Sequence, residues 1–495
     1  MSTRRDQRMW QPAGPNAALF PTRAEREHTD DLLTRQLAAA HARVAGGSVT
    51  PALDPDALRR ELAAFDFATA QPLADLLTWT IAQLEHGVVH MTHPRYFGLF
   101  NPSPAFPAQC ADRVAATFNP QLASAVTSPA ATAIEAHVIG AMARRAGLPE
   151  PNGGHFTNGG SEANSTALIC ALTEAAPKFA EDGARAFAGP PAFYMSRDCH
   201  LAWLKIAHVA GIGRAAARLV PTDGAGRMDT RALATMIAAD TAAGAVPVMI
   251  VATAGTTNAG MIDPLADCAA IAAANGLWYH VDAAWAGALL TSNQLSGALA
   301  GIERADSITI DAHKWLATTM GCGMFLTRRP HVLASAFHVA ASFMPPNQSS
   351  LDPYLTSLQW SRRFVGLRLF LSLAAAGWGG YGQHVERGVG LARLIGDRLT
   401  ARGWRIVNRS PAAVLCLEPP AGLMTAREIV SRVVASGAAW VSVATFEDRD
   451  VIRVCVTHGE TTTDDIDRLV EALDATMTQP PEMSQLALVN ITTRL

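Results

Sequence analysis

Lys314 is the side chain whose position best suits covalent chemistry. It lies in the sequence Asp-Ala-His-Lys-Trp, which directly follows a short β-branched run at residues 307–310. Ligands of α/β proteins gather at strand ends, where a lysine amine can hold a carbonyl cofactor as a Schiff base. A solvated surface lysine is the alternative, because a lone lysine after a strand is usually exposed. The choice depends on which other groups the chain brings to such an end.

A glycine-rich turn before a predicted helix offers a place for a phosphate. Gly160 and Ser161 belong to the sequence Asn-Gly-Gly-Ser-Glu, between a short strand and a helix. Backbone amides at the helix start, helped by the serine hydroxyl, can bind a phosphate group. An ordinary tight turn with a serine N-cap explains the same residues.

Asp282 ends the predicted strand Leu-Trp-Tyr-His-Val-Asp and is followed by small residues, including Ala284. A carboxylate at this place can pair with a protonated ring nitrogen, the state in which pyridoxal phosphate is an electron sink. Ala284 leaves room for a flat ring close to the backbone. A helix cap or a metal ligand is the alternative, although the neighbours offer no second carboxylate or metal-binding set.

His200 and Thr253 complete the set of polar candidates. A histidine at a helix start is more often a cap or a half-buried polar residue than a catalyst. Its interest comes from order along the chain: phosphate turn, histidine, threonine, carboxylate and lysine occur in one block of alternating strands and helices. This conjunction is a stronger signal than any of its members.

The elements that must position these residues fall into three parts and a tail. Residues 1–106 are predicted to form a helical arm, whose helices are too short for a core of their own and are expected to pack on a second subunit. Residues 107–385 alternate short apolar strands with helices, which predicts a large α/β domain with a mostly parallel sheet covered on both faces. Residues 386–480 predict a smaller α+β domain, and residues 481–495 are a tail without assignment.

The composition, net charge and number of cysteines restrict the class of protein. The 495 residues are 49% hydrophobic and 17% charged, with a net charge of -3, which favours a small-molecule partner over nucleic acid or an anionic membrane. The seven cysteines are odd in number and scattered, which predicts reduced thiols. With no secretory signal and no apolar stretch of membrane-spanning length, a cytoplasmic location is expected.

The ordered set of motifs resembles the group II pyridoxal-phosphate decarboxylases, the family of aromatic-amino-acid, histidine, glutamate and cysteinesulfinate decarboxylases. The resemblance extends over most of the chain and rests on segments that include TNGGSEANSTAL (157–168), ATAGTTNAGMIDP (252–264), HVDAAWAG (280–287) and DAHKW (311–315). It implies a type I aminotransferase-like fold, pyridoxal 5'-phosphate as the cofactor, and a homodimer with active sites at the subunit interface.

The resemblance also implies a role for each candidate on the cofactor side. Lys314 would bond the cofactor, and Asp282 would pair with its pyridine nitrogen. His200 and Ala284 would lie on the two faces of the ring, with Thr253 beside it. The groups implied to bind the phosphate are Gly160, Ser161 and His313.

On the substrate side, the resemblance places Arg453 where the family has an arginine that can clamp the substrate carboxylate. Leu99 and Phe100 belong to the pocket segment YFGLFNPSP. This segment lacks the Gln-Leu-Ser-Thr pattern of glutamate decarboxylases, so an apolar or aromatic L-amino acid is predicted instead. The implied reaction releases carbon dioxide and an amine.

Phe343 introduces an alternative product. Counting from Lys314 places it where aromatic-amino-acid decarboxylases have a loop tyrosine that returns a proton to the substrate carbon. Phenylalanine has no such proton, so either His338 or Tyr354 supplies it or the enzyme is a decarboxylation-dependent oxidative deaminase that forms aldehyde, ammonia and peroxide. A non-catalytic binding protein on the same fold is a third alternative, which would predict loss of Lys314 or Asp282.

Overall fold

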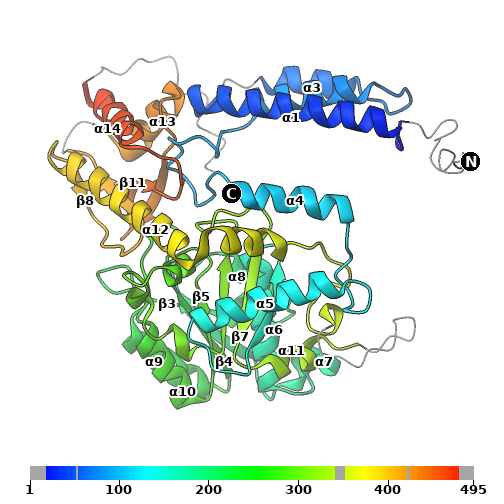
Figure 1. The fold of residues 1–495 in the computed structure, drawn as a ribbon. Coiled ribbons are helices and arrows are strands. Elements are labelled where there is room, and N and C mark those ends of the chain that lie inside the picture. Colours follow the sequence, from blue (N-terminus) through cyan, green and yellow to red (C-terminus); the bar gives the residue numbers. More distant parts are fainter. Residues whose placement is uncertain (1–17, 52–53, 340–351, 421–423, 479–495) are drawn as a thin grey trace, which may run out of the picture.

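A seven-stranded sheet forms the centre of the protein (Figure 1). The computed structural model describes residues 18–51, 54–339, 352–420 and 424–478. The strand order is β1-β7-β6-β5-β4-β2-β3, and β7 alone runs antiparallel to its neighbours. The strands are β1 (Gly153–Thr157), β2 (Pro191–Ser196), β3 (Ala217–Val220), β4 (Val246–Thr253), β5 (Trp278–Asp282), β6 (Ser307–Asp311) and β7 (Gly323–Thr327).

Helices cover both faces of this sheet, as the continuous apolar strands predict. One face packs on α6 (Gly160–Ala175), α8 (Ala202–Val209) and α11 (Pro330–Phe337), with the short α7 (Phe179–Asp182) nearby. The other face packs on α5 (Pro129–Arg145), α9 (Thr230–Ala242), α10 (Leu265–Asn275) and α12 (Gly366–Thr400). The predicted α/β class with a mostly parallel sheet is therefore confirmed.

The parallel strands end together at one edge of the sheet. The register pairs Thr253 of β4 with Asp282 of β5, and Asp282 with Thr309 of β6. Two predicted site residues on separate strands thus become neighbours. Short 3-10 helices among the described residues are η1 (Gly183–Ala186), η2 (Arg214–Ala216), η3 (Ala286–Thr291), η4 (Ser296–Leu299), η5 (Ile302–Arg304) and η6 (Pro353–Leu355).

A second, antiparallel sheet lies in the C-terminal part, in the order β10-β11-β9-β8. Its strands are β8 (Arg405–Ile406), β9 (Val414–Glu418), β10 (Ser442–Phe446) and β11 (Arg449–Cys455), with helices α13 (Ala426–Ser436) and α14 (Thr463–Thr478). Helix α12 joins it to the large sheet and contains one non-helical residue, Gly377. The predicted domain boundary at residue 385 falls inside this helix, so the division of the chain into domains stays a prediction.

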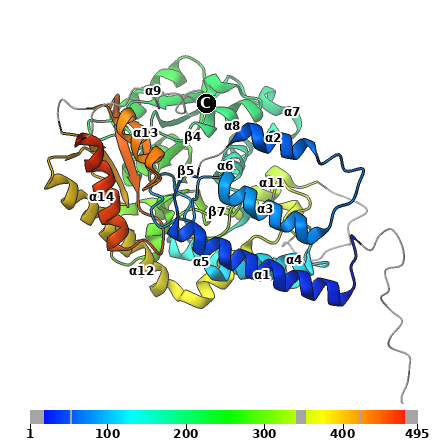
Figure 2. The same cartoon turned by 90° about the horizontal axis from the view of Figure 1, so that it is seen from above.

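The N-terminal arm is helical, as predicted, with α1 (Arg23–Gly46), α2 (Pro55–Ala63) and α3 (Leu73–Gly87), before α4 (Phe106–Phe118). Asp54 caps α2 by accepting hydrogen bonds from the backbone of Asp56 and Ala57. Figure 1 shows α1 and α3 at the edge of the molecule, away from the central sheet, and Figure 2 shows the same two helices side by side from above. Among these three helices one residue, Ala40, is buried.

All seven cysteines are free thiols, in agreement with the sequence prediction. A separate search of the helices in the described ranges finds none with the length and apolarity needed to cross a membrane.

His155 on β1 makes the fold sensitive to acid. It is buried beside Phe325, and neither ring nitrogen has a hydrogen-bond partner among the described residues. Burial lowers the pKa of His155 to about 3, whereas the unfolded chain takes up the proton near 6.5. This histidine's contribution to stability is therefore present above pH 6.5 and is lost as the pH falls toward the folded value.

We expect His155→Phe to flatten this dependence, because phenylalanine cannot take up a proton. The free energy of unfolding of the natural protein should fall, through this one group, by about 1.4 kcal/mol per pH unit below the unfolded value. Urea unfolding at several pH values from about 5 to about 8 measures the difference. Parallel profiles for the two proteins would contradict the expectation.

Candidate active site

A cavity of about 410 Å³ opens at the edge where β4, β5 and β6 end. Its walls come from the turn before α6, the ends of these strands, the loop after β2 and the turn that carries Lys314. The lining residues are Phe100, Asn158, Gly159, Gly160, Ser161, Glu162, Asn164, His200, Thr253, Gly255, Thr257, Asp282, Ala284, Trp285, Asp311, His313 and Lys314. The structure thus brings together the cofactor-side candidates of the sequence.

Lys314 reaches the cavity from the turn that follows β6. Its Nζ lies 3.0 Å from Oδ2 of Asp311, whose side chain is almost fully buried. The other carboxylate oxygen of Asp311 has no hydrogen-bond partner in the described part of the chain. His313 Nε2 lies 3.9 Å from the same Oδ2. Burial lowers the pKa of His313, and the Asp311 carboxylate opposes this effect.

The chain beyond Lys314 is fixed by a buried arginine and an aspartate. Arg368 of α12 donates from Nε to Asp112 (2.7 Å) and from Nη1 to the carbonyl of Gly321 (3.0 Å). Asp112 also accepts a hydrogen bond from the Thr319 hydroxyl, at 2.6 Å. The lysine turn is therefore tied at its far end to α4 and α12.

The turn before α6 lies tightly against the lysine turn at Gly160. A Cβ added to Gly160 would lie 2.9 Å from Asp311 Oδ2 and 3.4 Å from Ala284 Cβ. Any larger residue would therefore close this part of the cavity. The first backbone N–H groups of a helix have no partner within the helix, so they are free to bind an anion. Ser161 stands at this helix start and lines the cavity.

Asp282 lines the same cavity from the end of β5 and is buried. Its Oδ2 accepts a hydrogen bond from Asn164 Nδ2 at 2.8 Å, and its Oδ1 accepts one from the backbone N–H of Ala284 at 3.2 Å. On the neighbouring strand, Thr253 presents a buried hydroxyl without a hydrogen-bond partner among the described residues. This hydroxyl lines the cavity, where a bound group can satisfy it.

His200 lines the cavity from the loop after β2 and stays accessible to solvent. Its Nδ1 accepts the backbone N–H of Ala202 at 3.2 Å, so the ring proton is on Nε2. Partial desolvation lowers the pKa of His200, while the Asp282 carboxylate opposes the shift. The ring is therefore neutral at neutral pH and can lie flat against another ring.

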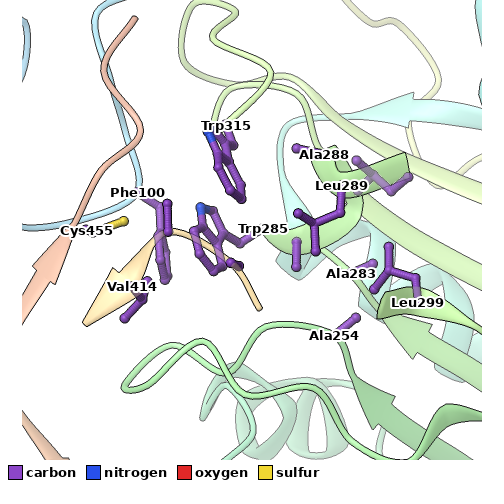
Figure 3. Close-up of a cluster of buried hydrophobic side chains, with 14 of the residues drawn as sticks. Phe100, Ala254, Ala283, Trp285, Ala288, Leu289, Leu299, Trp315, Val414 and Cys455 are labelled. Atoms are coloured by element: carbon purple, nitrogen blue, oxygen red, sulfur yellow. The ribbon is translucent and has the colours of Figure 1, made fainter. Parts of the chain in front are cut away.

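The cavity is bounded on one side by stacked aromatic rings (Figure 3). The ring centroids of Phe100 and Trp285 are 4.5 Å apart, and those of Trp285 and Trp315 are 4.9 Å apart with nearly parallel planes. Phe100 and Trp285 line the cavity. They provide an apolar wall next to the lysine.

The other substrate-side candidates lie outside the lining. Leu99 is 43% exposed and Arg453 is buried on β11. Arg453 donates to the carbonyls of Thr257 and Gly98, each at 2.7 Å, and its guanidinium lies over the Phe100 ring. Their contacts with a substrate stay predictions.

Neither the loop residue Phe343 nor the two proposed proton donors are among the described lining residues. Phe343 lies outside the described residues. His338 and Tyr354 are described but do not line the cavity.

Sequence reasoning missed Asp311, Asn164 and Trp285 as parts of the site. Asp311 was detectable, because it ends β6 three residues before the lysine, as Asp282 ends β5. Asn164 gives no such signal, since its partner Asp282 is 118 residues away. Only packing of α6 on the sheet brings the two side chains together.

The donor set fits a phosphorylated aromatic aldehyde such as pyridoxal phosphate. Lys314 offers an amine, Asp282 a buried carboxylate, and Gly160 and Ser161 the first backbone N–H groups of α6. The Thr253 hydroxyl, which has no hydrogen-bond partner among the described residues, is a local feature that a bound cofactor would satisfy, and a glycine at position 160 keeps this end of the cavity free of a side chain.

Comparisons with known proteins agree with this fit. The model of the pyridoxal-dependent decarboxylase conserved domain matches residues 55–416. An L-2,4-diaminobutyrate decarboxylase of Rhizobium meliloti is 35% identical over 297 residues, which are 59% of this chain but only 58% of that protein. A tyrosine decarboxylase of Oryza sativa is 31% identical over 398 residues, covering 77% of this chain and 74% of that protein.

Solved structures support the same assignment. The crystal structure of Oryza sativa TDC with PLP and tryptamine has a TM-score of 0.86 to this protein at 25% identity, covering 95% of this chain and 100% of that one. The predicted fold and the predicted cofactor, pyridoxal 5'-phosphate, are thereby confirmed. The chain belongs to the pyridoxal-dependent decarboxylase family and is an amino-acid decarboxylase that uses pyridoxal phosphate.

Proposed function

We propose that the protein decarboxylates an L-amino acid with an apolar or aromatic side chain and releases carbon dioxide and an amine. The observation that carries the proposal is the meeting of Lys314, Asp282 and the Gly160 turn in one cavity beside an aromatic wall. Within the described residues, Lys314 is the one lysine or arginine in the lining. A glutamate side chain would thus find no free cation there, which favours an apolar substrate.

Each residue of the cavity has a proposed role that follows from its chemistry. Bound pyridoxal phosphate supplies an electron sink for the electrons left behind when carbon dioxide departs. Lys314 Nζ holds the cofactor covalently, and the Asp282 carboxylate holds the proton at the ring nitrogen. His200 and Ala284 pack on the two ring faces, with Thr253 beside the ring. The phosphate is bound by Gly160, Ser161 and His313.

Arg453 is the proposed clamp for the substrate carboxylate, because a guanidinium binds a carboxylate through two parallel hydrogen bonds. Both of its Nη atoms already donate to backbone carbonyls. These two bonds use two of its five N–H donors, and its buried Nε has no hydrogen-bond partner among the described residues, so donors remain for a carboxylate. Arg453 would thereby hold the substrate carboxylate in a fixed orientation for its loss as carbon dioxide.

A second subunit is proposed to cover the N-terminal arm. A cavity of about 910 Å³ lies between the arm and helices α4 and α12. Leu37, Leu62, Leu73 and Leu84 are about half exposed on α1, α2 and α3, which is unusual for a helix set that stands alone. Sedimentation velocity tests this proposal, and a monomeric mass at micromolar concentration would exclude the homodimer.

The reaction is tested by incubating the holoenzyme with a panel of L-amino acids and measuring carbon dioxide, amine, aldehyde, ammonia and peroxide. We expect apolar or aromatic amino acids to give carbon dioxide and amine in equal amounts. Turnover of glutamate alone would overturn the substrate class. Absence of turnover with every amino acid, despite cofactor binding, would favour a binding protein on the same fold.

The second candidate is a decarboxylation-dependent oxidative deaminase, and Phe343 is the observation that favours it. In that reaction dioxygen takes two electrons and becomes hydrogen peroxide, while water releases the carbon skeleton as an aldehyde and the nitrogen as ammonia. Phe343→Tyr would then move the product from aldehyde and peroxide to amine. Phe337→Tyr is the matched control. If the natural protein is a simple decarboxylase, peroxide stays absent in all three proteins.

A further inference from the structure

Asp282 is the last member of a buried chain of hydrogen bonds. Asn164 Nδ2 lies 2.8 Å from Asp282 Oδ2, and Asn164 Oδ1 lies 3.1 Å from His280 Nε2. His280 Nδ1 lies 2.8 Å from the hydroxyl of Ser307, which is 2.8 Å from Trp278 Nε1. All five residues are at most 5% exposed. This series of hydrogen bonds therefore runs from Trp278 to Asp282, at the edge of the cavity, through the buried interior of the protein.

The periodicity of the strands explains why these groups line up. Trp278, His280 and Asp282 alternate along β5, so their side chains point to the same face of the sheet. Ser307 is the register partner of His280 on the parallel strand β6. Asn164 comes from α6, which packs on this face. The chain is thus built from three elements that also form the cavity.

The donors and acceptors of the chain can point in one direction only. The Trp278 indole N–H has no lone pair to accept with, so it must donate to Ser307. The Asp282 carboxylate can only accept, so Asn164 turns its carbonyl oxygen toward His280 Nε2, which therefore carries the ring proton. In a neutral ring Nδ1 then accepts from the Ser307 hydroxyl, and the Thr309 hydroxyl lies farther away, 3.4 Å from Nε2. The Asn164 amide N–H is left to donate to Asp282.

This arrangement needs a neutral His280, with one nitrogen as an acceptor and the other as a donor. Burial lowers the pKa of His280 to about 4, and the Asp282 carboxylate opposes the shift. At neutral pH the ring therefore keeps one proton. Hydrogen bonds in such a chain polarise one another, and a donor directed at a carboxylate stabilises its ionised form.

We propose that Trp278, Ser307, His280 and Asn164 are positioning residues that keep Asp282 ionised and aimed at the ring nitrogen of the cofactor, so that the shared proton stays on the ring. The inference rests on the proposed role of Asp282. When a donor is removed, the carboxylate binds a proton more tightly. The shared proton then moves from the ring nitrogen toward Asp282, and the cofactor becomes a weaker electron sink.

The test uses holoenzyme loaded with pyridoxal phosphate that carries ¹⁵N in the ring, and follows the ring-nitrogen chemical shift against pH. We expect Asn164→Ala and His280→Phe to lower the pH at which the ring nitrogen loses its proton by about one unit, a tenfold loss of proton affinity. His280→Gln, which keeps an N–H near the position of Nε2, should restore most of the shift. Cofactor affinity for the apoprotein, measured by equilibrium titration, gives a second readout.

Two tryptophans supply a matched pair of variants. Trp278→Phe removes the first donor of the chain and should give a smaller shift in the same direction. Trp203→Phe removes an indole N–H that has no hydrogen-bond partner among the described residues, although its ring packs edge-on against His280 at 5.6 Å. It should therefore leave the ring-nitrogen signal unchanged.

The possible results distinguish a failure of the positioning role from a failure of the proposed role of Asp282. The positioning role would be overturned if Asn164→Ala and His280→Phe kept the pH of ring-nitrogen deprotonation seen in the natural protein, and if Trp278→Phe and Trp203→Phe gave the same value. If Asp282→Asn also left the ring-nitrogen signal unchanged, the proposed role of Asp282 itself would fail. Thermal unfolding of each holoenzyme identifies variants whose fold is lost. If Asn164→Ala or His280→Phe is among them, the milder substitutions His280→Gln and Trp278→Phe still test the positioning role.

Discussion

Lys314→Ala is expected to lower kcat/KM for decarboxylation by about a thousandfold or more, because the variant has no amine to hold the cofactor. Lys314 is the one lysine in the described cavity lining, so no neighbouring amine can replace it. Reduction with borohydride followed by peptide mass spectrometry gives an independent readout. The natural protein should carry the added mass on the peptide with Lys314, and the variant should carry none.

The effect of losing the amine in Lys314→Ala must be distinguished from the effect of losing a positive charge. Removing Lys314 leaves Asp311 without its ion-pair partner, which lowers stability. Lys314→Arg keeps a cation at this place but has no amine that forms a Schiff base, so it should be as inactive as the alanine variant. Lys205→Ala, on the exposed face of α8, should behave like the natural protein. A modified peptide in Lys314→Ala, or normal turnover in either Lys314 variant, would refute the assignment.

Asp282→Asn is expected to have the second largest effect, a fall in kcat of about a hundredfold to a thousandfold. The variant loses the negative charge that holds a proton on the ring nitrogen, which weakens the electron sink when carbon dioxide leaves. An asparagine amide also cannot accept from both Asn164 and the Ala284 backbone as the carboxylate does without presenting N–H to N–H. The covalent link to Lys314 should persist, so borohydride still labels that peptide.

Steady-state kinetics with the best amino acid of the substrate panel measure this effect. The loss should fall on kcat more than on KM, since the charge acts when bond breaking begins. Asp306→Asn is a suitable control, because Asp306 is also a buried aspartate but pairs with Arg329 at the opposite edge of the sheet. It should lower stability and leave kcat near the natural value. An equal loss of kcat in both variants would show that the Asp282 effect is structural.

Much of the large sheet was predictable from local sequence. The runs 247–253, 277–282 and 307–310 predict the strands that end at Thr253, at Asp282 and shortly before Lys314, and the structure places β4, β5 and β6 within a residue or two of these ranges. Such runs are specified by burial on both faces, a property that each segment carries by itself. Because parallel strands end at one edge, the meeting of their terminal residues followed from the same pattern.

Helix α12 was only partly predictable. Residues 389–401 by themselves predict a helix, but the structure extends that helix back to Gly366 across Gly377, whose φ is 65°. A positive φ normally ends a helix, and here the chain continues because residues on both sides pack on the same hydrophobic core. Local propensity therefore misplaced the start of this element, since the deciding contacts are tertiary.

The sequence by itself determined the fold class, the cofactor and the order of the groups proposed to bind it, because each depends on the type of residue at a strand end or a helix start. Only the tertiary structure decided the partners of those groups. It pairs Lys314 with Asp311, joins Asp282 to Asn164, and turns the Arg453 guanidinium toward two backbone carbonyls. Hydrogen bonds and ion pairs need atoms within about 3.5 Å, and folding alone brings residues a hundred or more positions apart to that distance.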